Sequence, residues 1–176
     1  GPAYGGSCFP KDTRALVSTG RMFKTNLSVV KSVINSNDKR TNLLLNKISK
    51  IMNNKIKNKN ITFLGVTFKP GTDDMRESSS LKMIPSLTRK GAYVNYYEPT
   101  GKKEELKSKN INFFENIKDA CKIADLIIIH TEWNEFKQIN FKKITKKRNF
   151  KVFDMRNLYS TSEMKKNKIN YFSIGR

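Results

Sequence analysis

The sequence contains only two cysteines, Cys8 and Cys121, in 176 residues. Two cysteines provide no disulfide framework, and a chain of this length does not need one in order to fold. The two lie in different contexts, because Cys8 stands among glycines and Cys121 in a helix-like stretch. We therefore expect free thiols and a reducing, cytoplasmic setting.

Long apolar runs and a targeting segment are also absent. The most apolar stretch, Leu126 to Ile129, has the length of a strand, whereas a membrane-spanning helix needs about 20 apolar residues. The chain has no initiator methionine and no signal pattern, and it opens with the loop-like residues 1–6 (GPAYGG). We expect no membrane association, and we expect the sequence to be a piece of a longer protein, whether natural or truncated.

Acidic residues are scarce, since 15 Asp and Glu stand against 35 Lys and Arg, for a formal net charge of +20. A charge of this size is typical of nucleic-acid-binding proteins. Here the excess is mostly lysine, spread along the chain among asparagine and isoleucine, as in residues 53–60 (NNKIKNKN). A/T-rich coding produces this bias without any binding role, and arginine, the better reader of phosphates and bases, is scarcer. We rank specific nucleic-acid binding last and expect the charge to favour small anionic ligands such as nucleotides.

The apolar residues are sufficient for a core, because 37% of the chain is hydrophobic and 10% aromatic. From residue 12 to about residue 56 no proline occurs and apolar residues recur at helical spacing. They are Val29, Val30, Val33, Ile34, Leu44, Leu45, Ile48, Ile51 and Met52. The pattern predicts one long helix, or two helices with a break near residues 36–38. We predict that residues 1–58 form a unit distinct from residues 59–176.

The second unit alternates apolar strands with helices. Strands are predicted at 61–66, 92–97, 111–114, 125–130 and 151–154, and helices at 80–90, 102–107, 116–124, 133–136 and 141–146. Strands that are apolar throughout and alternate with helices favour a parallel sheet with helices on both faces, so the fold class is α/β. Such a sheet binds ligands at the carboxyl ends of its strands. The loops after Val66, Tyr97, His130 and Asp154 are therefore where we expect binding residues.

The segment Gly5-Gly6-Ser7-Cys8-Phe9-Pro10-Lys11-Asp12 carries the strongest chemical signal. Small residues beside Cys8 let a substrate approach closely, and a helix beginning near Lys11 would stabilise the nucleophilic thiolate. Asp12 is placed to orient water or to accept a proton. The pattern fits equally well a glycine turn with Asp12 as a capping residue and Cys8 buried. The spacing does not match a zinc or Cys-x-x-Cys site, so we expect no metal.

Three motifs extend the signal into a resemblance. Residues 5–12 are similar to the active-site segment of UDP-glucose dehydrogenases, residues 65–78 (GVTFKPGTDDMRES) are a second match, and residues 131–136 (TEWNEF) a weaker third. Their order and spacing agree with the UDP-glucose/GDP-mannose dehydrogenase family over essentially the whole chain. The resemblance implies a central dimerisation helix, so we expect a homodimer, followed by a Rossmann-like domain that binds the nucleotide-sugar.

The resemblance also implies an activity, the oxidation of the C6 alcohol of UDP-glucose to a carboxylate with two NAD⁺ in turn. Carried over by position, Cys8 attacks the aldehyde intermediate and Asp12 is the orienting or basic group for hydrolysis of the thioester. Gly1, Gly5 and Lys69 bind the substrate. Lys11 and Arg76 contact NAD. Without the resemblance, the sequence favours the interpretation of Lys69 and Arg76 as ordinary cations of a surface loop. Asp73, Asp74 and Glu77 receive no role.

The chain departs from the family in lacking the strand-linked G-x-G-x-x-G of an NAD-binding domain. We therefore expect this chain alone to lack dehydrogenase activity. Ala3 stands where UDP-glucose enzymes often have glycine, which keeps GDP-mannose 6-dehydrogenase open as an alternative, while Phe9 favours UDP-glucose. A non-catalytic nucleotide-sugar-binding half-protein is the remaining alternative.

Overall fold

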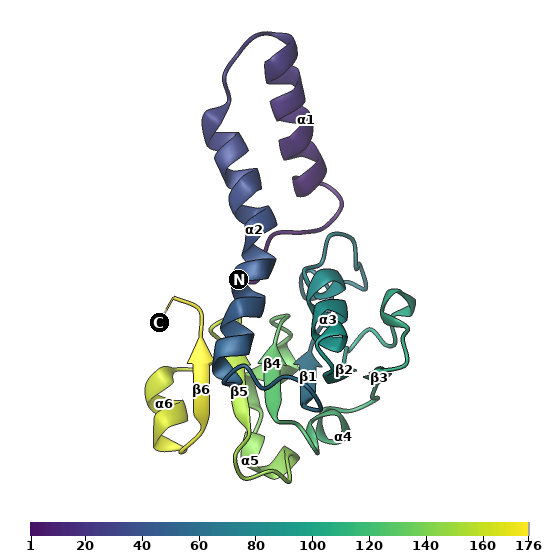
Figure 1. Ribbon diagram of the computed structural model, residues 1–176, viewed down its shortest axis with the longest axis vertical. Helices are drawn as coiled ribbons and strands as arrows, with labels where there is room; N and C mark the ends of the chain where they lie inside the picture. The colour runs from purple at the N-terminus through teal and green to yellow at the C-terminus, as the bar shows by residue number, and fades with distance from the viewer. Residues whose placement is uncertain (176) are drawn as a thin grey trace.

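The computed structural model describes residues 1–175 (Figure 1). In it, a helical hairpin projects beyond the carboxyl ends of the strands of a parallel sheet. The hairpin consists of α1 (Phe9–Met22) and α2 (Ser28–Ile51). Within the described residues the sheet has six strands, all parallel, in the order β3-β2-β1-β4-β5-β6. The strands are β1 (Asn60–Leu64), β2 (Tyr93–Tyr97), β3 (Ile111–Phe113), β4 (Leu126–Ile129), β5 (Lys151–Asp154) and β6 (Asn170–Ser173). The chain reverses its direction of travel across the sheet between β1 and β4, as in doubly wound folds.

Helices cover both faces of this sheet, which confirms the predicted fold class. They are α3 (Ser80–Arg89), α4 (Ile117–Cys121), α5 (Phe141–Ile144) and α6 (Thr161–Lys166), with 3₁₀ turns η1 (Glu104–Leu106) and η2 (Asn134–Gln138). Side chains alternate between the faces along each strand. Phe63 and Ile128 pack with α2 and α3 in one cluster, whereas Leu64 and Ile129 pack with residues of α4, α5 and α6 in a second. All four are buried, so the sheet has an apolar layer on each side.

The predicted strands are confirmed to within about two residues at each end, and 151–154 matches β5. Gly91 follows the end of α3, where it adopts φ +82° and donates its N–H to the C=O of Thr88 at 2.8 Å. Two elements, α6 and β6, were not predicted. The edge strand β6 is only partly buried, so it lacks the continuous apolar run that marks the central strands.

Both predicted alternatives, one long helix or a break near residues 36–38, are wrong, because there are two helices and α2 continues through residues 36–38. The polar side chain of Asn37 is used in a tertiary contact, accepting the N–H of Tyr4 at 2.9 Å, and so does not interrupt the helix. The break lies instead at residues 23–27, where Lys24 takes φ 53°. No glycine or proline marks that turn in the sequence. The helix α1 also begins earlier than predicted, at Phe9.

The C-terminal half of α2 belongs to the core of the sheet. Leu44, Leu45, Ile48 and Ile51 pack in the same cluster as Phe63 of β1. The asparagine-rich run then reverses the chain, since Asn53, Asn54 and Asn58 adopt φ between 52° and 60°, a left-handed conformation that asparagine tolerates well. The hairpin is therefore joined to the sheet by a continuous apolar layer.

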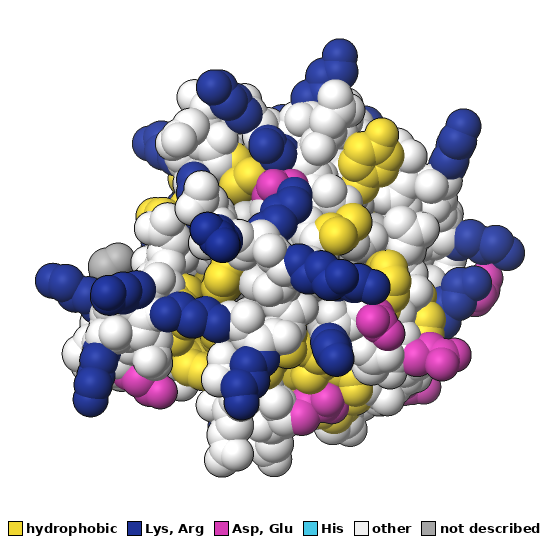
Figure 2. All heavy atoms as spheres, turned by 90° about the horizontal axis from the view of Figure 1, so that it is seen from below, with side chains coloured by type: hydrophobic (Ala, Val, Ile, Leu, Met, Phe, Trp, Pro, Cys, Tyr) yellow, Lys and Arg dark blue, Asp and Glu magenta, His cyan; other side chains and the backbone are white. Residues whose placement is uncertain are grey.

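The basic side chains do not form a stripe on the face opposite the hairpin. Figure 2 shows them scattered over this whole face, interspersed with small apolar patches and with acidic groups. No helix within residues 1–175 is long and apolar enough to cross a membrane.

The continuous core gives a stability prediction. Replacing Ile48, which is 0% exposed, with Ala should lower the free energy of unfolding by about 2–5 kcal/mol because a cavity forms between α2 and the sheet. Ile123→Ala is the matched control, since Ile123 is 48% exposed, and should change it by about 0.5 kcal/mol or less. Urea unfolding followed by circular dichroism measures both. Equal effects of the two substitutions would contradict the shared core.

Candidate functional site

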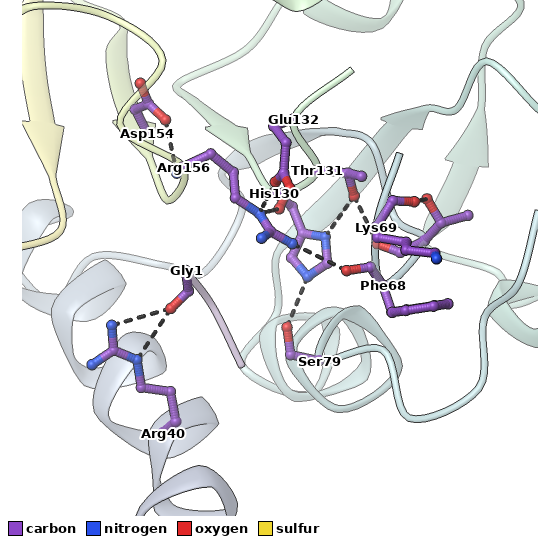
Figure 3. A network of polar contacts seen from close by, with 11 residues as sticks. Gly1, Arg40, Phe68, Lys69, Ser79, His130, Thr131, Glu132, Asp154 and Arg156 are labelled. Atoms are coloured by element: carbon purple, nitrogen blue, oxygen red, sulfur yellow. Dashed lines mark hydrogen bonds and ion pairs between the residues drawn. The ribbon is translucent and has the colours of Figure 1, made fainter. Parts of the chain in front are cut away.

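The N-terminal segment lies across the carboxyl edge of the sheet, between the loop that follows β1 and helix α2 (Figures 1 and 3). Gly6 donates its N–H to the C=O of Arg76 at 2.8 Å. Tyr4 and Asn37 exchange two hydrogen bonds, at 2.9 and 3.2 Å. The segment that carries the cysteine is thus fixed on two sides by residues distant in the sequence.

Close packing requires the glycine pair of this segment. A Cβ on Gly5 would lie 2.4 Å from the carbonyl oxygen of Glu77, and a Cβ on Gly6 would lie 2.8 Å from the ring of Phe68. Gly6 also adopts φ +84°, which L side chains rarely take. The two glycines therefore let the backbone approach Phe68 and the loop after β1.

Cys8 is exposed at the N-terminus of α1, as the residue immediately before the first helical turn. The alternative of a buried Cys8 is therefore wrong. Asp12 lies one turn later and donates its N–H to the C=O of Cys8 at 2.8 Å. Lys11 and Asp12 form an ion pair at 3.3 Å, and both side chains are largely exposed. The second thiol, Cys121, is a fully buried core residue, and burial raises its pKa.

A cavity of about 930 Å³ opens beside the N-terminal segment. Its walls come from that segment, from α2 and from the sheet edge, and it is lined by Gly1, Ala3, Tyr4, Gly5, Ser28, Val29, Ser32, Val33, Ser36, Asn37, Arg40, Phe68 and Arg156. Two guanidinium groups meet at Gly1. Arg40 donates to the C=O of Gly1 at 3.1 and 3.2 Å, and Nη1 of Arg156 lies 3.1 Å from the position of a Cβ on that glycine. The cavity therefore combines apolar walls with positive charge.

Arg156 is the most constrained cation of this edge (Figure 3). Its Nε lies 2.6 Å from Oε2 of Glu132 and donates to the C=O of His130 at 2.8 Å, while Nη2 donates to the C=O of Phe68 at 3.1 Å. Asp154 at the end of β5 accepts the N–H of Arg156 at 2.9 Å. Burial lowers the pKa of Arg156, and the Glu132 carboxylate opposes this shift. Sequence analysis singled out the loop after Asp154 but missed this residue, and it also missed Arg40.

His130 links three parts of the carboxyl edge from inside. The side chain is buried, with Nε2 2.8 Å from the Ser79 hydroxyl and Nδ1 3.2 Å from the Thr131 hydroxyl. Thr131 gives its single hydroxyl proton to the C=O of Thr67 at 2.7 Å. It therefore accepts from Nδ1–H, and Ser79 donates to Nε2. Burial, reinforced by the charge of Arg156, lowers the pKa of His130 to about 3. His130 is therefore neutral, and it joins Ser79 to Thr131 by hydrogen bonds in addition to standing at the end of a strand.

Lys69 and Arg76 lie in the loop after β1, as the sequence predicts, but neither lines the cavity. Lys69 is exposed, with Nζ 5.4 Å from the centroid of the Phe68 ring. Arg76 makes a bidentate contact with Asp74 at 2.8–3.1 Å, which lowers the pKa of that carboxyl group. The structure therefore brings Gly1 and Gly5 to the cavity, and places the other predicted site residues on exposed surfaces around it.

The other acids of this loop have structural contacts. Glu77 pairs with Arg14 of α1 at 3.3 Å, and the C=O of Asp73 accepts from Nζ of Lys103 at 3.3 Å. Among residues 1–175, no group of three or more His, Cys, Asp or Glu side chains is placed to hold a metal ion.

Comparison with known proteins identifies the family of this chain. Residues 62–161 match the UDP-binding domain of the UDP-glucose/GDP-mannose dehydrogenase family, and residues 1–39 match its central domain. The chain belongs to this family. The UDP-glucose 6-dehydrogenase of Rickettsia prowazekii (strain Madrid E) is 38% identical over 179 residues, covering 99% of this chain and 41% of the relative. That of Rhizobium meliloti (strain 1021) is also 38% identical, over 100% and 41%.

Solved structures of the family share the fold. The chain matches a UDP-glucose dehydrogenase from Pyrobaculum islandicum with a TM-score of 0.81 and 24% identity, over 99% of this chain and 38% of that one. It matches an NDP-N-acetyl-D-galactosaminuronic acid dehydrogenase from Methanosarcina mazei Go1 with a TM-score of 0.86 and 21% identity, over 100% and 39%. The chain thus spans about two fifths of the length of the relatives that it matches.

The buried neutral His130 predicts a pH dependence of stability. The unfolded chain binds a proton at this residue near pH 6.5 and the folded chain only near pH 3, so folding stability falls as the pH drops through this window. Between pH 6 and pH 4 the free energy of unfolding of wild type should fall more steeply than that of His130→Gln, by up to about 1.4 kcal/mol per pH unit. Urea unfolding at several pH values compares them. Equal slopes would show that His130 titrates normally in the folded chain.

Proposed function

We propose that this chain is the C-terminal part of an NAD-dependent UDP-glucose 6-dehydrogenase. The observation that carries the proposal is the exposed Cys8, which stands at the N-terminus of α1 on a loop fixed beside a cationic cavity. The two relatives at 38% identity, both called UDP-glucose 6-dehydrogenase, support the substrate over GDP-mannose. Because the chain spans about two fifths of those relatives, the activity belongs to the longer protein.

The nucleotide-sugar is the proposed occupant of the cavity. The backbone of Gly1 and Gly5 in the N-terminal segment binds the nucleotide-sugar, and Lys69 contacts it from the loop after β1. To these we add Arg40 and Arg156, whose guanidinium groups meet at Gly1 and offer positive charge to a diphosphate. The apolar walls suit the rings of the ligand.

Cys8 is the proposed nucleophile. Its sulfur adds to the carbon of the C6 aldehyde and forms a thiohemiacetal, whose oxidation gives a thioester. Water then cleaves the C–S bond, releasing the carboxylate and the free thiol. Asp12, one helical turn from Cys8, orients that water or takes its proton. The helix N-terminus at Cys8 favours negative charge on the sulfur and on its adducts.

NAD⁺, when bound, accepts the hydride in each of the two oxidation steps. The exposed cations Lys11 and Arg76 are proposed to contact the anionic cofactor. Both lie near Cys8, because Lys11 is in the first turn of α1 and the C=O of Arg76 accepts the N–H of Gly6. Arg76 is held in place by its bidentate contact with Asp74. The rest of a cofactor site lies outside the residues of this chain.

We further propose a homodimer formed through the hairpin, with residues 1–58 and 59–176 as separate functional units in a cytoplasmic enzyme. Apolar side chains of the hairpin that do not line the cavity remain largely exposed, at Phe9, Leu16, Met22, Phe23 and Leu43. Covering them against the same face of a second copy would remove this surface from water.

The chemistry is tested in the full-length dehydrogenase that contains this chain. Cys8→Ser should abolish steady NADH production from UDP-glucose, because the thioester cannot form. Cys121→Ala is the matched control: its thiol is buried in the core of the sheet domain, and turnover should continue. A spectrophotometric assay of NADH formation compares the two variants. Normal turnover by Cys8→Ser would overturn the proposed mechanism.

The dimer proposal predicts the mass of the chain in solution. Sedimentation equilibrium at micromolar concentration should give twice the chain mass, and Met22→Lys together with Phe23→Lys should shift the equilibrium to monomer, because charges would then face the apolar surface. Lys substitutions at Tyr93 and Ile123, exposed residues of the sheet domain, are the controls and should leave the dimer intact. A monomeric wild-type chain would contradict the proposal.

A further inference from the structure

The first loop of this sheet is already filled by a carboxylate of the chain itself. Glu98 follows the last residue of β2 and is 1% exposed. Its Oε2 accepts the backbone N–H of Val66 at 2.7 Å and that of Thr67 at 3.2 Å, and lies 3.4 Å from the Thr67 hydroxyl. Its Oε1 accepts from the Thr100 hydroxyl at 3.2 Å. Both carboxylate oxygens are thus used inside the protein.

The position of these amides gives the contact its meaning. Backbone N–H groups that follow the first strand of a doubly wound sheet are the groups that bind ligand phosphates in dinucleotide-binding folds. Here the equivalent amides, those of Val66 and Thr67, bind an internal anion instead. The opposite side of the loop is closed too, because Thr131 donates to the C=O of Thr67 at 2.7 Å and a Cβ on Gly65 would lie 2.5 Å from Thr131.

The loop that Glu98 holds leads directly to the cysteine. Phe68 follows Thr67, and its ring is the surface on which Gly6 packs. The Thr67 hydroxyl donates to the C=O of Lys69 at 3.0 Å, so the same residue fixes the start of the Lys69 turn. The contacts therefore run from Glu98 through Thr67 to Phe68, and from Phe68 to the segment that carries Cys8.

We propose that Glu98 is a positioning residue that takes the place of a bound phosphate at the loop after β1 and so fixes Phe68 and Lys69 for the nucleotide-sugar. Two consequences follow. Phosphates of a ligand are bound by side chains such as Lys69, and not by the backbone amides of Val66 and Thr67. The loop is also preformed before the ligand arrives, which reduces the entropy lost on binding. The effect on ligand affinity rests on the proposed function, whereas the filling of the loop does not.

The first arm of the test needs no nucleotide-sugar. In the unliganded chain, Glu98→Ala should remove hydrogen-exchange protection from the amides of Val66 and Thr67, observed by ¹H–¹⁵N NMR. Acetate should restore the protection saturably in this variant and have no effect on wild type, because a free carboxylate then occupies the vacated space. Unprotected wild-type amides, or a variant that does not respond to acetate, would overturn the proposal.

The second arm measures the affinity of the chain for UDP-glucose by isothermal titration. Glu98→Ala should weaken binding about tenfold or more, equivalent to about 1.4 kcal/mol, and acetate should recover most of the loss. Asp125→Asn is the matched control, because Asp125 accepts the N–H of Asn60 at 2.8 Å at the opposite end of β1. Asp125→Asn should leave the affinity unchanged. If Asp125→Asn lost as much affinity as Glu98→Ala, and acetate did not restore the affinity of Glu98→Ala, Glu98 would have only a general structural role and the proposal would be overturned.

A third variant covers the case in which Glu98→Ala does not fold. Glu98→Gln keeps an acceptor oxygen but loses the charge, and hydrogen bonds to a charged acceptor are roughly twice as strong. Its amide protection and its affinity should both fall between wild type and full loss, whereas wild-type values in both measurements would contradict the positioning role. If wild type does not bind UDP-glucose, the proposed function fails, and the amide measurements alone then decide the filling of the loop.

Discussion

The contact between the glycine pair and the loop after β1 is the constraint on which the site depends. Gly5 and Gly6 come so close to Glu77 and Phe68 that a single Cβ at either position would collide with them. This approach joins a segment at the beginning of the chain to the carboxyl edge of a sheet that starts some fifty residues later. Together with the hydrogen bonds between Tyr4 and Asn37, this contact sets the position of Cys8 relative to the cavity.

The loop that receives the glycines is itself held by buried polar groups. The carboxylate of Glu98 and the hydroxyl of Thr131 bind its backbone, and Arg156 binds the C=O of Phe68. Inside a protein such hydrogen bonds are stronger than in water, and an unpaired partner is correspondingly costly. Buried charge is compensated here, because His130 stays neutral and Arg156 forms an ion pair with Glu132.

The sequence predicts the central part of this structure well, because the signals there are local. Continuous apolar runs identify β1, β4 and β5, and helices between them leave little alternative to a parallel sheet. The turn at 23–27 contains no glycine or proline, and the edge strand β6 is half exposed, so neither leaves a strong local pattern. Asn37 lies in a polar run that is typical of a helix break. In the structure α2 continues through it, and the Asn37 side chain bonds to Tyr4.

The candidate site divides in the same way. Cys8 and the loop containing Lys69 stand out in the sequence because glycines and clustered charges mark them. Arg40 and Arg156 do not stand out in the sequence. Arg40 lies in a lysine-rich helical stretch, and Arg156 follows an ordinary strand. Only the fold brings both to Gly1. Glu98 carries even less signal, because an acid after a strand is common at a surface. Its burial and its two backbone partners are properties of the assembled sheet alone.

The filled loop also shows how one fold can present its carboxyl edge in two ways. A doubly wound sheet offers free amides after its first strand, and a dinucleotide uses them directly. When an internal carboxylate occupies those amides, the same edge presents side chains and a preformed turn instead. Under the proposed function, the ligand is then recognised by residues from outside the sheet as well, because the N-terminal segment and α2 line the cavity. Such a site is complete only when the N-terminal segment is in place, so the proposal couples binding of the ligand to the position of Cys8.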